Sequence, residues 1–171
     1  MKRQALYFGT FNPLHIGHVT VLRYLLQCGS FDRVAVVVSP QSPFKSDLED
    51  SAKKRLEGVK KDVAKLGLDV EVLDTEFHLN PPYYTVNTLK YISDSMPGWQ
   101  QILVMGADNV KGLENWHNSR ELLDSYEIWV YPRPGYRVKT ACKRLGLKLI
   151  DAPTVDISST EIREKKIGRG I

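Results

Sequence analysis

Short apolar runs, separated by longer segments with helical spacing, are the feature that most limits how this chain can fold. The runs are rich in Val, Ile and Leu and do not alternate with polar residues, which is typical of strands covered on both faces of a parallel sheet. Such an order of strands and helices predicts an α/β fold with a doubly wound, mostly parallel, Rossmann-like sheet. The expected strands are residues 5–9, 33–38, 70–74, 102–106, 128–132 and 148–152, and the expected helices are residues 17–28, 48–66, 85–95, 108–124 with a break, and 138–145.

Length, charge and cysteine content narrow the class of protein. The chain has 171 residues and a net charge of +4, and it shows no linker composition, so we expect one domain over residues 1–171. The charge suits an anionic ligand and is too small to indicate nucleic acid binding. No signal peptide is recognisable, and no apolar run approaches the roughly eighteen residues of a membrane helix. Cys28 and Cys142 are not spaced like metal ligands, and a disulfide framework would need more cysteines than these two. We expect a cytoplasmic protein without a nucleic acid or membrane partner, and the sequence leaves homo-oligomerisation open.

The segments that follow the expected strands predict where a ligand binds. In open α/β sheets, ligands bind beyond the carboxyl ends of the strands, near the point where the strand order reverses. Glycines, hydroxyl groups and basic side chains all fall at that edge, and such residues are suited to binding phosphate. Representative members are Gly9, Lys45, Gly106, Arg133 and Arg163.

The first of these segments, GTFNPLHIGH, joins the first strand to the first helix. Gly9 permits a sharp exit from the strand, and the backbone amides of Thr10 and Phe11 are available to a phosphate near the positive end of the helix. His15 and His18 lie on one face of the first helical turn, where each can donate to phosphate oxygens, more strongly if protonated. The structural alternative is that both histidines cap the helix or satisfy buried polar groups. The glycine at the strand exit, combined with the H-x-G-H spacing, favours the phosphate-binding role.

The segment SSTEIR, near the end of the chain, predicts a second helix start at the same edge. Ser158 and Glu161 have the spacing of a capping box, which by itself explains both residues structurally. Ser159 and Thr160 add hydroxyl groups that can contact phosphate. Arg163 lies near the positive end of the predicted helix, where a cation is disfavoured unless an anion is close by.

Several segments together make the chain similar to a known enzyme family. GTFNPLHIGH resembles the (T/H)-x-G-H signature of the nucleotidyltransferase superfamily, and SSTEIR resembles its second motif. Class I aminoacyl-tRNA synthetases share the tetrapeptide HIGH, but they are much larger, and this chain has no KMSKS loop. Within the superfamily, the chain resembles the bacterial nicotinate mononucleotide adenylyltransferases through six segments in the family's order: GTFNPLHIGH, SPQSPFK, YYTVNTLKYI, GADNVKGLENW, RPGY and SSTEIR.

Two departures from the family pattern are modest. Phe8 stands where many members have a second glycine, and Asn12 replaces the usual aspartate. Asn12 keeps a side-chain acceptor for the turn but carries no charge, which argues against a role as metal ligand. The resemblance implies a Rossmann-like nucleotidyltransferase fold.

The resemblance also implies roles for residues whose types alone leave two interpretations open. Trp116 is implied to lie against the nicotinate ring, although an aromatic residue in a helical segment is more often part of the core. Thr85 is implied to approach the carboxyl group of that ring.

Three further positions have a structural alternative as well. The Gly106–Asp108 turn is implied to contact the adenosine part of ATP, although Asp108 could simply cap a helix. Lys45 and Arg133 are implied to bind the phosphate of the mononucleotide, although each could be a solvated surface charge.

The reaction implied is adenylyl transfer from ATP to nicotinate mononucleotide, which gives deamido-NAD and pyrophosphate in NAD biosynthesis. The acceptor phosphate is anionic near neutral pH, because its second pKa is about 6, so no nucleophilic side chain is needed. We expect His15, His18 and Arg163 to be catalytic, with Mg²⁺ accompanying ATP and no metal site made by the protein alone. The alternatives are another small nucleotidyltransferase, such as the phosphopantetheine type, and a non-catalytic nucleotide-binding module.

Overall fold

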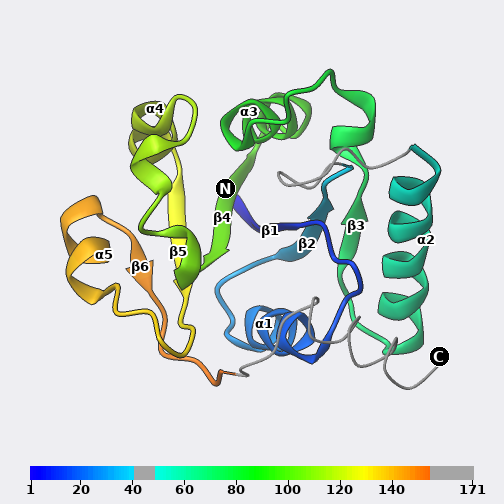
Figure 1. Cartoon of the computed structure of the whole chain (residues 1–171), viewed down its shortest axis with the longest axis horizontal. Coiled ribbons are helices and arrows are strands. Elements are labelled where there is room, and N and C mark those ends of the chain that lie inside the picture. The colour runs from blue at the N-terminus through cyan, green and yellow to red at the C-terminus, as the bar shows by residue number, and fades with distance from the viewer. Residues whose placement is uncertain (41–48, 155–171) are drawn as a thin grey trace.

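A computed structural model of the chain, which describes residues 1–40 and 49–154, contains one six-stranded sheet (Figure 1). The strand order is β3-β2-β1-β4-β5-β6, and every neighbouring pair is parallel. The order reverses between β1 and β4, as in doubly wound nucleotide-binding sheets, so the predicted fold class is confirmed. The strands are β1 (Lys2–Gly9), β2 (Arg33–Val38), β3 (Glu71–Leu73), β4 (Trp99–Gly106), β5 (Glu127–Tyr131) and β6 (Lys148–Leu149).

Helices cover both faces of the sheet. Helices α1 (Ile16–Gln27) and α2 (Glu49–Lys65) contribute to one apolar cluster. Helices α3 (Thr85–Ser95), α4 (Ser119–Ser125) and α5 (Lys139–Leu145) contribute to the other. Three short 3₁₀ turns, η1 (Thr75–His78), η2 (Ala107–Asn109) and η3 (Leu113–Asn115), complete the connections.

The continuous apolar runs are explained by this two-sided burial. In β2, Val36 belongs to the cluster under α1 and α2, whereas the next residue, Val37, belongs to the cluster under α3, α4 and α5. Ile102 and Leu103 divide in the same way in β4. Because successive side chains of a strand point to opposite faces, a strand with two buried faces needs apolar residues at every position.

The prediction of an interrupted helix over residues 108–124 is confirmed only in its last part, where α4 lies, and is wrong before it. That segment contains the turns η2 and η3, and only the short helix α4 is α-helical. Gly112 interrupts the segment with a residue of low helix propensity, and Asn118 adopts a left-handed conformation with φ of 50° immediately before α4. Apolar spacing over this stretch therefore reflects burial of successive turns and not one helix.

Several strand boundaries also differ from the prediction, most clearly in β1, β4 and β6. β1 begins at Lys2 and not at residue 5, because Lys2, Arg3 and Gln4 pair with the first residues of β4. Gln4 is fully buried there and donates from its amide to Gln101 over 2.7 Å. The last strand ends at Leu149, and the chain beyond it is held by the Tyr131 hydroxyl, which donates to the Pro153 carbonyl oxygen.

Among residues 1–40 and 49–154, no helix is both long enough and apolar enough to cross a membrane.

Candidate active site

The loop after β1 is shaped by Phe11, which lies under the end of the strand. Phe11 has a φ of 47°, an uncommon value for a bulky residue, and its side chain is buried. A Cβ atom at Gly9 would lie 3.0 Å from Phe11 Cζ, so a larger residue at position 9 would displace the ring. The Phe11 and His18 rings meet edge to face with centroids 4.9 Å apart. The loop therefore brings its backbone turn directly beside the first histidine-bearing helix.

His15 and His18 cap helix α1 reciprocally. His15 is the N-cap residue, and its Nδ1 accepts from the backbone N–H groups of Gly17 at 3.0 Å and His18 at 3.4 Å. His18 Nδ1 accepts from the backbone N–H of His15 at 3.2 Å, and the two rings stack with centroids 3.7 Å apart. Because Nδ1 of each ring accepts a hydrogen bond, the neutral rings carry their protons at Nε2. The capping and phosphate-binding interpretations are thus compatible, since they use different nitrogens.

Burial keeps His18 neutral. Desolvation is the main cause that lowers the pKa of His18 to about 3, with smaller contributions from His15 and from the charge of Arg133. A neutral imidazole donates from Nε2–H near neutral pH without first taking up a proton. The stronger, protonated donor considered from the sequence therefore does not apply to His18 in this structure.

Asp108 and Arg133 meet at the carboxyl ends of β4 and β5. Arg133 Nη1 lies 2.9 Å from Asp108 Oδ2, and both side chains are about one-third exposed. A Cβ atom at Gly106 would lie 2.5 Å from Asp108 Oδ1, so glycine leaves room for the carboxylate to turn back over the strand. Burial, followed by the charge of Asp108, raises the pKa of the nearby Tyr7 hydroxyl. Residues predicted separately for ATP and for the mononucleotide are thus in direct contact.

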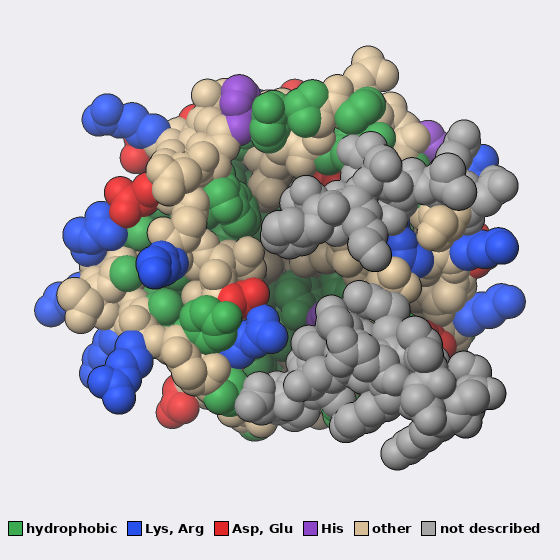
Figure 2. Space-filling model, in the orientation of Figure 1, with side chains coloured by type: hydrophobic (Ala, Val, Ile, Leu, Met, Phe, Trp, Pro, Cys, Tyr) green, Lys and Arg blue, Asp and Glu red, His purple; other side chains and the backbone are tan. Residues whose placement is uncertain are grey.

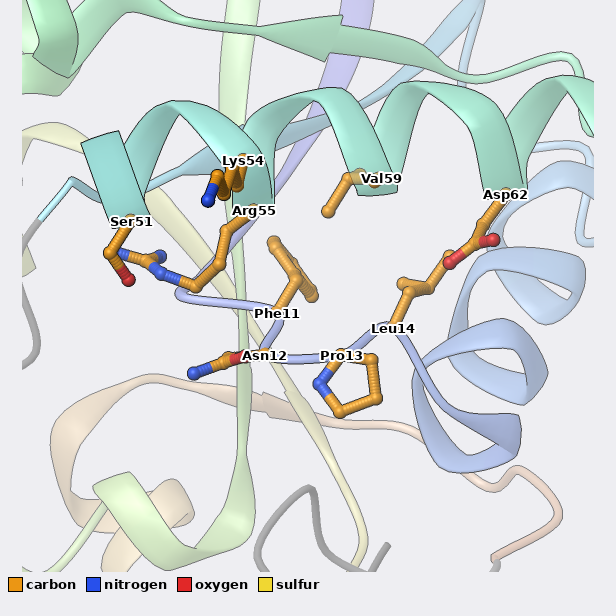
Figure 3. Close-up of a pocket in the computed structure, with 10 residues that line it drawn as sticks. Phe11, Asn12, Pro13, Leu14, Ser51, Lys54, Arg55, Val59 and Asp62 are labelled. Atoms are coloured by element: carbon orange, nitrogen blue, oxygen red, sulfur yellow. The ribbon is translucent and has the colours of Figure 1, made fainter. Parts of the chain in front are cut away.

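A pocket of about 290 Å³ lies between the first loop and α2. Figure 3 shows the loop against the helix, with the Phe11 ring directed toward it. Arg55 from α2 donates to the Thr10 carbonyl oxygen at 2.9 Å, which fixes the loop from the side of the helix. The pocket is lined by Phe11, Asn12, Pro13, Leu14, Ser51, Lys54, Arg55, Gly58, Val59 and Asp62.

The residues predicted to bind the pyridine ring lie on two adjacent segments. Thr85 is the first residue of α3, and Trp116 follows η3, half-buried against the apolar cluster under α3, α4 and α5. The rings of Tyr84 and His117 stack with centroids 4.0 Å apart and join the two segments. Sequence reasoning interpreted His117 as an ordinary polar residue and gave Tyr84 no role, although each directly adjoins a residue that had been singled out.

The remaining predicted site residues, Lys45, Ser159, Thr160 and Arg163, lie outside the described residues. Viewed from the same side as Figure 1, the surface shows a hollow with apolar side chains on its floor and an acidic and a basic side chain at its margin (Figure 2). Within the described ranges, no group of three or more His, Cys, Asp or Glu side chains is arranged to hold a metal ion.

Comparison with known proteins identifies the family. The sequence model of the cytidylyltransferase-like family matches residues 6–165. A Flavobacterium psychrophilum protein named "Probable nicotinate-nucleotide adenylyltransferase" is 38% identical over 166 residues, which cover 94% of this chain and 84% of that protein. A protein of the same name from Caldicellulosiruptor saccharolyticus is 34% identical over 167 residues, covering 93% of this chain and 84% of that protein. The chain belongs to the cytidylyltransferase-like family, within its nicotinate-nucleotide adenylyltransferases.

Solved structures support the fold of this family. The Plasmodium falciparum nicotinic acid mononucleotide adenylyltransferase complexed with NaAD superimposes with a TM-score of 0.84 at 20% identity, covering 96% of this chain and 83% of that one. The same Plasmodium falciparum enzyme complexed with APC gives a TM-score of 0.80 at 18% identity, with the same coverage. At these identities, the likeness concerns the arrangement of the sheet and helices.

Proposed function

We propose that the protein is a nicotinate-nucleotide adenylyltransferase, which transfers the adenylyl group of ATP to nicotinate mononucleotide and releases pyrophosphate. The product is deamido-NAD, an intermediate of NAD biosynthesis. The observation that carries the proposal is the pair of capping histidines, in a chain that is 38% identical to a relative of that name over nearly its whole length. Their Nε2 protons are placed at the positive end of α1, beside the switch point of the sheet.

The reaction requires the protein to position charged groups and stabilise their charge. It does not require a nucleophilic side chain. The attacking phosphate of the mononucleotide is already anionic near neutral pH, because its second pKa is about 6. The protein must bring two anions together, align them and stabilise charge on the departing pyrophosphate. Neutral His18 suits this role, because a preorganised N–H donor needs no proton exchange during the reaction.

The division of the site between the two substrates follows from the family resemblance together with the observed contacts. We assign ATP to the loop after β1 and the turn after β4, and the mononucleotide to the start of α3 and the loop after β5. The ion pair between Asp108 and Arg133 lies at the boundary of the two halves. The proposed ATP contacts are Gly9, Thr10, Phe11, His15, His18, Gly106 and Asp108, with Ser159, Thr160 and Arg163, and the proposed mononucleotide contacts are Lys45, Thr85, Trp116 and Arg133.

Magnesium enters this proposal as part of the ATP complex. Mg²⁺ keeps several water ligands and commonly binds through substrate phosphates, so it does not require a protein cage. We further propose that residues 1–171 act as one nucleotidyltransferase domain. We place the domain in the cytoplasm, where the free thiols of Cys28 and Cys142 stay reduced.

The direct test is pyrophosphate release from ATP and Mg²⁺ across a panel of acceptors. The panel contains nicotinate mononucleotide, nicotinamide mononucleotide and phosphopantetheine, and CTP replaces ATP in a second series. We expect ATP with the acid mononucleotide to give the highest kcat/KM. A preference for phosphopantetheine or for CTP contradicts the proposal, and nucleotide binding without turnover of any acceptor indicates a binding module.

The same assay measures the preference for acid over amide. A pocket that offers only donors, such as the Thr85 hydroxyl and backbone N–H groups, satisfies a carboxylate but leaves the NH₂ group of an amide unpaired. An unpaired buried polar group costs about 1–3 kcal/mol, so we expect about a ten- to hundred-fold preference for the acid in kcat/KM. Equal use of both mononucleotides contradicts a donor-only pocket.

A further inference from the structure

A buried polar network runs beneath the two halves of the proposed site, and its centre is Ser39, the residue after β2. The Ser39 backbone N–H donates to the Gly9 carbonyl oxygen at 2.9 Å, and its hydroxyl donates to Glu76 Oε1 at 2.5 Å. Arg55 donates to the Ser39 carbonyl oxygen at 2.9 Å, and the Thr88 hydroxyl donates to Glu76 Oε2 at 2.8 Å. We call Arg55, Ser39, Glu76 and Thr88 the Ser39 network.

Three of the four residues of the network are buried and Ser39 is partly buried, so the geometry is tightly constrained. Glu76 is 1% exposed, Thr88 is 0% exposed and Arg55 is 7% exposed. A buried carboxylate is costly unless both oxygens accept hydrogen bonds, and here each oxygen accepts one hydroxyl group. Burial raises the pKa of Glu76, whereas the hydrogen bonds from Ser39 and Thr88 act in the opposite direction. Removing either hydroxyl leaves a carboxylate oxygen without that partner, and the remaining groups must then shift.

One end of the network reaches the loop after β1. The Arg55 guanidinium donates from Nη1 to the Thr10 carbonyl oxygen, as well as to that of Ser39, and from Nη2 to the Pro40 carbonyl oxygen at 2.8 Å. One buried side chain therefore sets the spacing between the end of β2 and the loop that precedes the two histidines.

The other end of the network reaches the start of α3. Thr88 lies one turn after Thr85. Its backbone N–H donates to the Tyr84 carbonyl oxygen at 3.2 Å, and its hydroxyl oxygen lies 3.3 Å from the same atom. The hydroxyl bond to Glu76 therefore ties the first turn of α3 to Ser39. The turn held in this way contains Thr85, which we assign to the pyridine carboxylate.

We propose that Glu76 is a positioning residue for the acceptor, which holds the first turn of α3 in register with the loop after β1 through the hydroxyls of Thr88 and Ser39. This inference rests on the proposed function. Glu76 does not contact substrate in this role. Its effect passes through Thr88 to the site of the pyridine carboxylate.

The positioning role of Glu76 predicts that Ser39, which lies beside the ATP loop, affects binding of the mononucleotide. Ser39 adjoins the ATP loop through Gly9, but its hydroxyl is bonded to Glu76. Loss of that hydroxyl should therefore change binding of the mononucleotide more than binding of ATP. A purely structural network predicts lower stability and an unchanged KM for both substrates.

The experiment compares Thr88→Val, Ser39→Ala and the double variant with the parent full-length protein. Steady-state kinetics give kcat and separate KM values for ATP and nicotinate mononucleotide, and thermal melting monitors the fold. Thr88→Ser restores a hydroxyl and tests rescue. Ser95→Ala is the matched control, because the Ser95 hydroxyl bonds locally to the Ile92 carbonyl oxygen at the far end of the same helix.

We expect Thr88→Val to raise KM for the mononucleotide about ten-fold, with KM for ATP within about two-fold of the parent. Ser39→Ala should act in the same direction, Thr88→Ser should recover most of the loss, and Ser95→Ala should match the parent. Because both hydroxyls act through one carboxylate, the double variant should depart from the product of the single effects by about three-fold or more.

Two results overturn the inference in distinguishable ways. An active parent whose Thr88→Val and Ser39→Ala variants keep the parental KM for the mononucleotide, whatever their melting temperatures, overturns the positioning role alone. A folded parent that makes no deamido-NAD from ATP and nicotinate mononucleotide overturns the proposed function, and the inference falls with it.

Discussion

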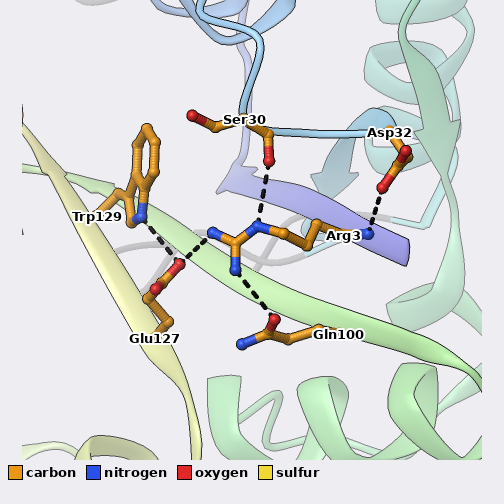
Figure 4. Close-up of polar contacts among 6 residues, drawn as sticks. All are labelled: Arg3, Ser30, Asp32, Gln100, Glu127 and Trp129. Atoms are coloured by element: carbon orange, nitrogen blue, oxygen red, sulfur yellow. Dashed lines mark hydrogen bonds and ion pairs between the residues drawn. The ribbon is translucent and has the colours of Figure 1, made fainter. Parts of the chain in front are cut away.

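The two ends of the sheet use polar side chains in opposite ways. At the amino end, Arg3 contacts four partners on three neighbouring segments through donors of its backbone and guanidinium groups (Figure 4). At the carboxyl end, His15 and His18 cap α1 with Nδ1 and keep their protons at Nε2, and Arg133 has an ion pair with Asp108. The partners of Arg3 are Asp32, the Ser30 carbonyl oxygen, Gln100 and Glu127, and the last also accepts from the Trp129 indole N–H.

The comparison separates a group that stabilises the fold from groups that we propose to bind a ligand. Arg3 donates to several protein acceptors at once. If a ligand replaced any one of these acceptors, the hydrogen bonds from Arg3 to the others would be distorted. The histidines use one nitrogen to hold their own rings in place, so the second nitrogen is oriented before a ligand arrives. Such preorganisation is what charge stabilisation during catalysis requires.

The largest expected effect is on His18. His18→Ala removes both the cap and the Nε2–H donor, and we expect kcat to fall by about a hundred- to a thousand-fold. His18→Gln is the sharper variant, because glutamine at this helix position can still accept from the His15 backbone N–H in a capping box. The measurements are kcat and the free energy of unfolding in urea.

We expect His18→Gln to keep nearly parental stability and still lose most of its activity, whereas His18→Ala should also lose about 1 kcal/mol of stability. Parental kcat in folded His18→Gln would mean that capping is the whole role of this histidine.

The second effect concerns Arg133. Arg133→Ala removes a charged hydrogen-bond donor proposed for the mononucleotide phosphate, which is worth about 1.5–3 kcal/mol. We expect KM for the mononucleotide to rise about ten- to hundred-fold, with partial recovery in Arg133→Lys, because an ammonium is a point charge and not a planar fork. Unchanged KM values in Arg133→Ala would contradict phosphate binding by Arg133 and would mean that its ion pair with Asp108 is only a surface contact.

The third effect tests the amino end of the sheet. Arg3→Met keeps much of the side-chain length and removes the guanidinium donors, and because the side chain is 30% exposed we expect a loss of only about 1–3 kcal/mol in the free energy of unfolding. The values of kcat and KM should stay within about two-fold of the parent. Lys2→Met is the matched control on the adjacent exposed residue, with an expected change within about 0.5 kcal/mol. A loss of activity without a loss of stability in Arg3→Met would contradict the distinction between the amino and carboxyl ends of the sheet.

The fourth effect is a pH dependence. His18 has a folded pKa of about 3, below the ordinary value of 6.5, so the unfolded chain binds more protons between these values. The contribution of His18 to stability is therefore present above about pH 6.5 and is lost as the pH falls toward 3, with a slope of up to about 1.4 kcal/mol per pH unit.

Urea unfolding from pH 4 to pH 7 measures this slope, and the slope should be shallower in His18→Gln. The same neutrality predicts no ionisation of His18 in the pH profile of kcat/KM for the free enzyme between about pH 6 and pH 8. Equal slopes in parent and variant would contradict the low pKa.

Local spacing was enough to predict most of the fold and the proximity of the two histidines. Buried parallel strands need apolar residues at every position, so they are visible as short continuous runs, and β2 was predicted with its observed boundaries. His15 and His18 are three residues apart on one helix, so their proximity is a property of the helix itself. The assigned ligand contacts stay predictions.

Tertiary structure decided what depends on residues distant in the sequence. Residues 108–118 have helical apolar spacing but fold as turns, because Gly112 and Asn118 interrupt the segment while packing buries its apolar side chains. The polar start of β1 became a strand because β4 offered partners for it.

Burial is the main cause that lowers the pKa of His18, and smaller contributions come from His15 and from Arg133, a residue more than a hundred positions away in the sequence. One hydrogen bond of the Ser39 network joins Ser39 to Glu76, which lies 37 positions away in the sequence. No local pattern marks such contacts, because the cost of burying a polar group and the partner that offsets it are both set by the completed fold.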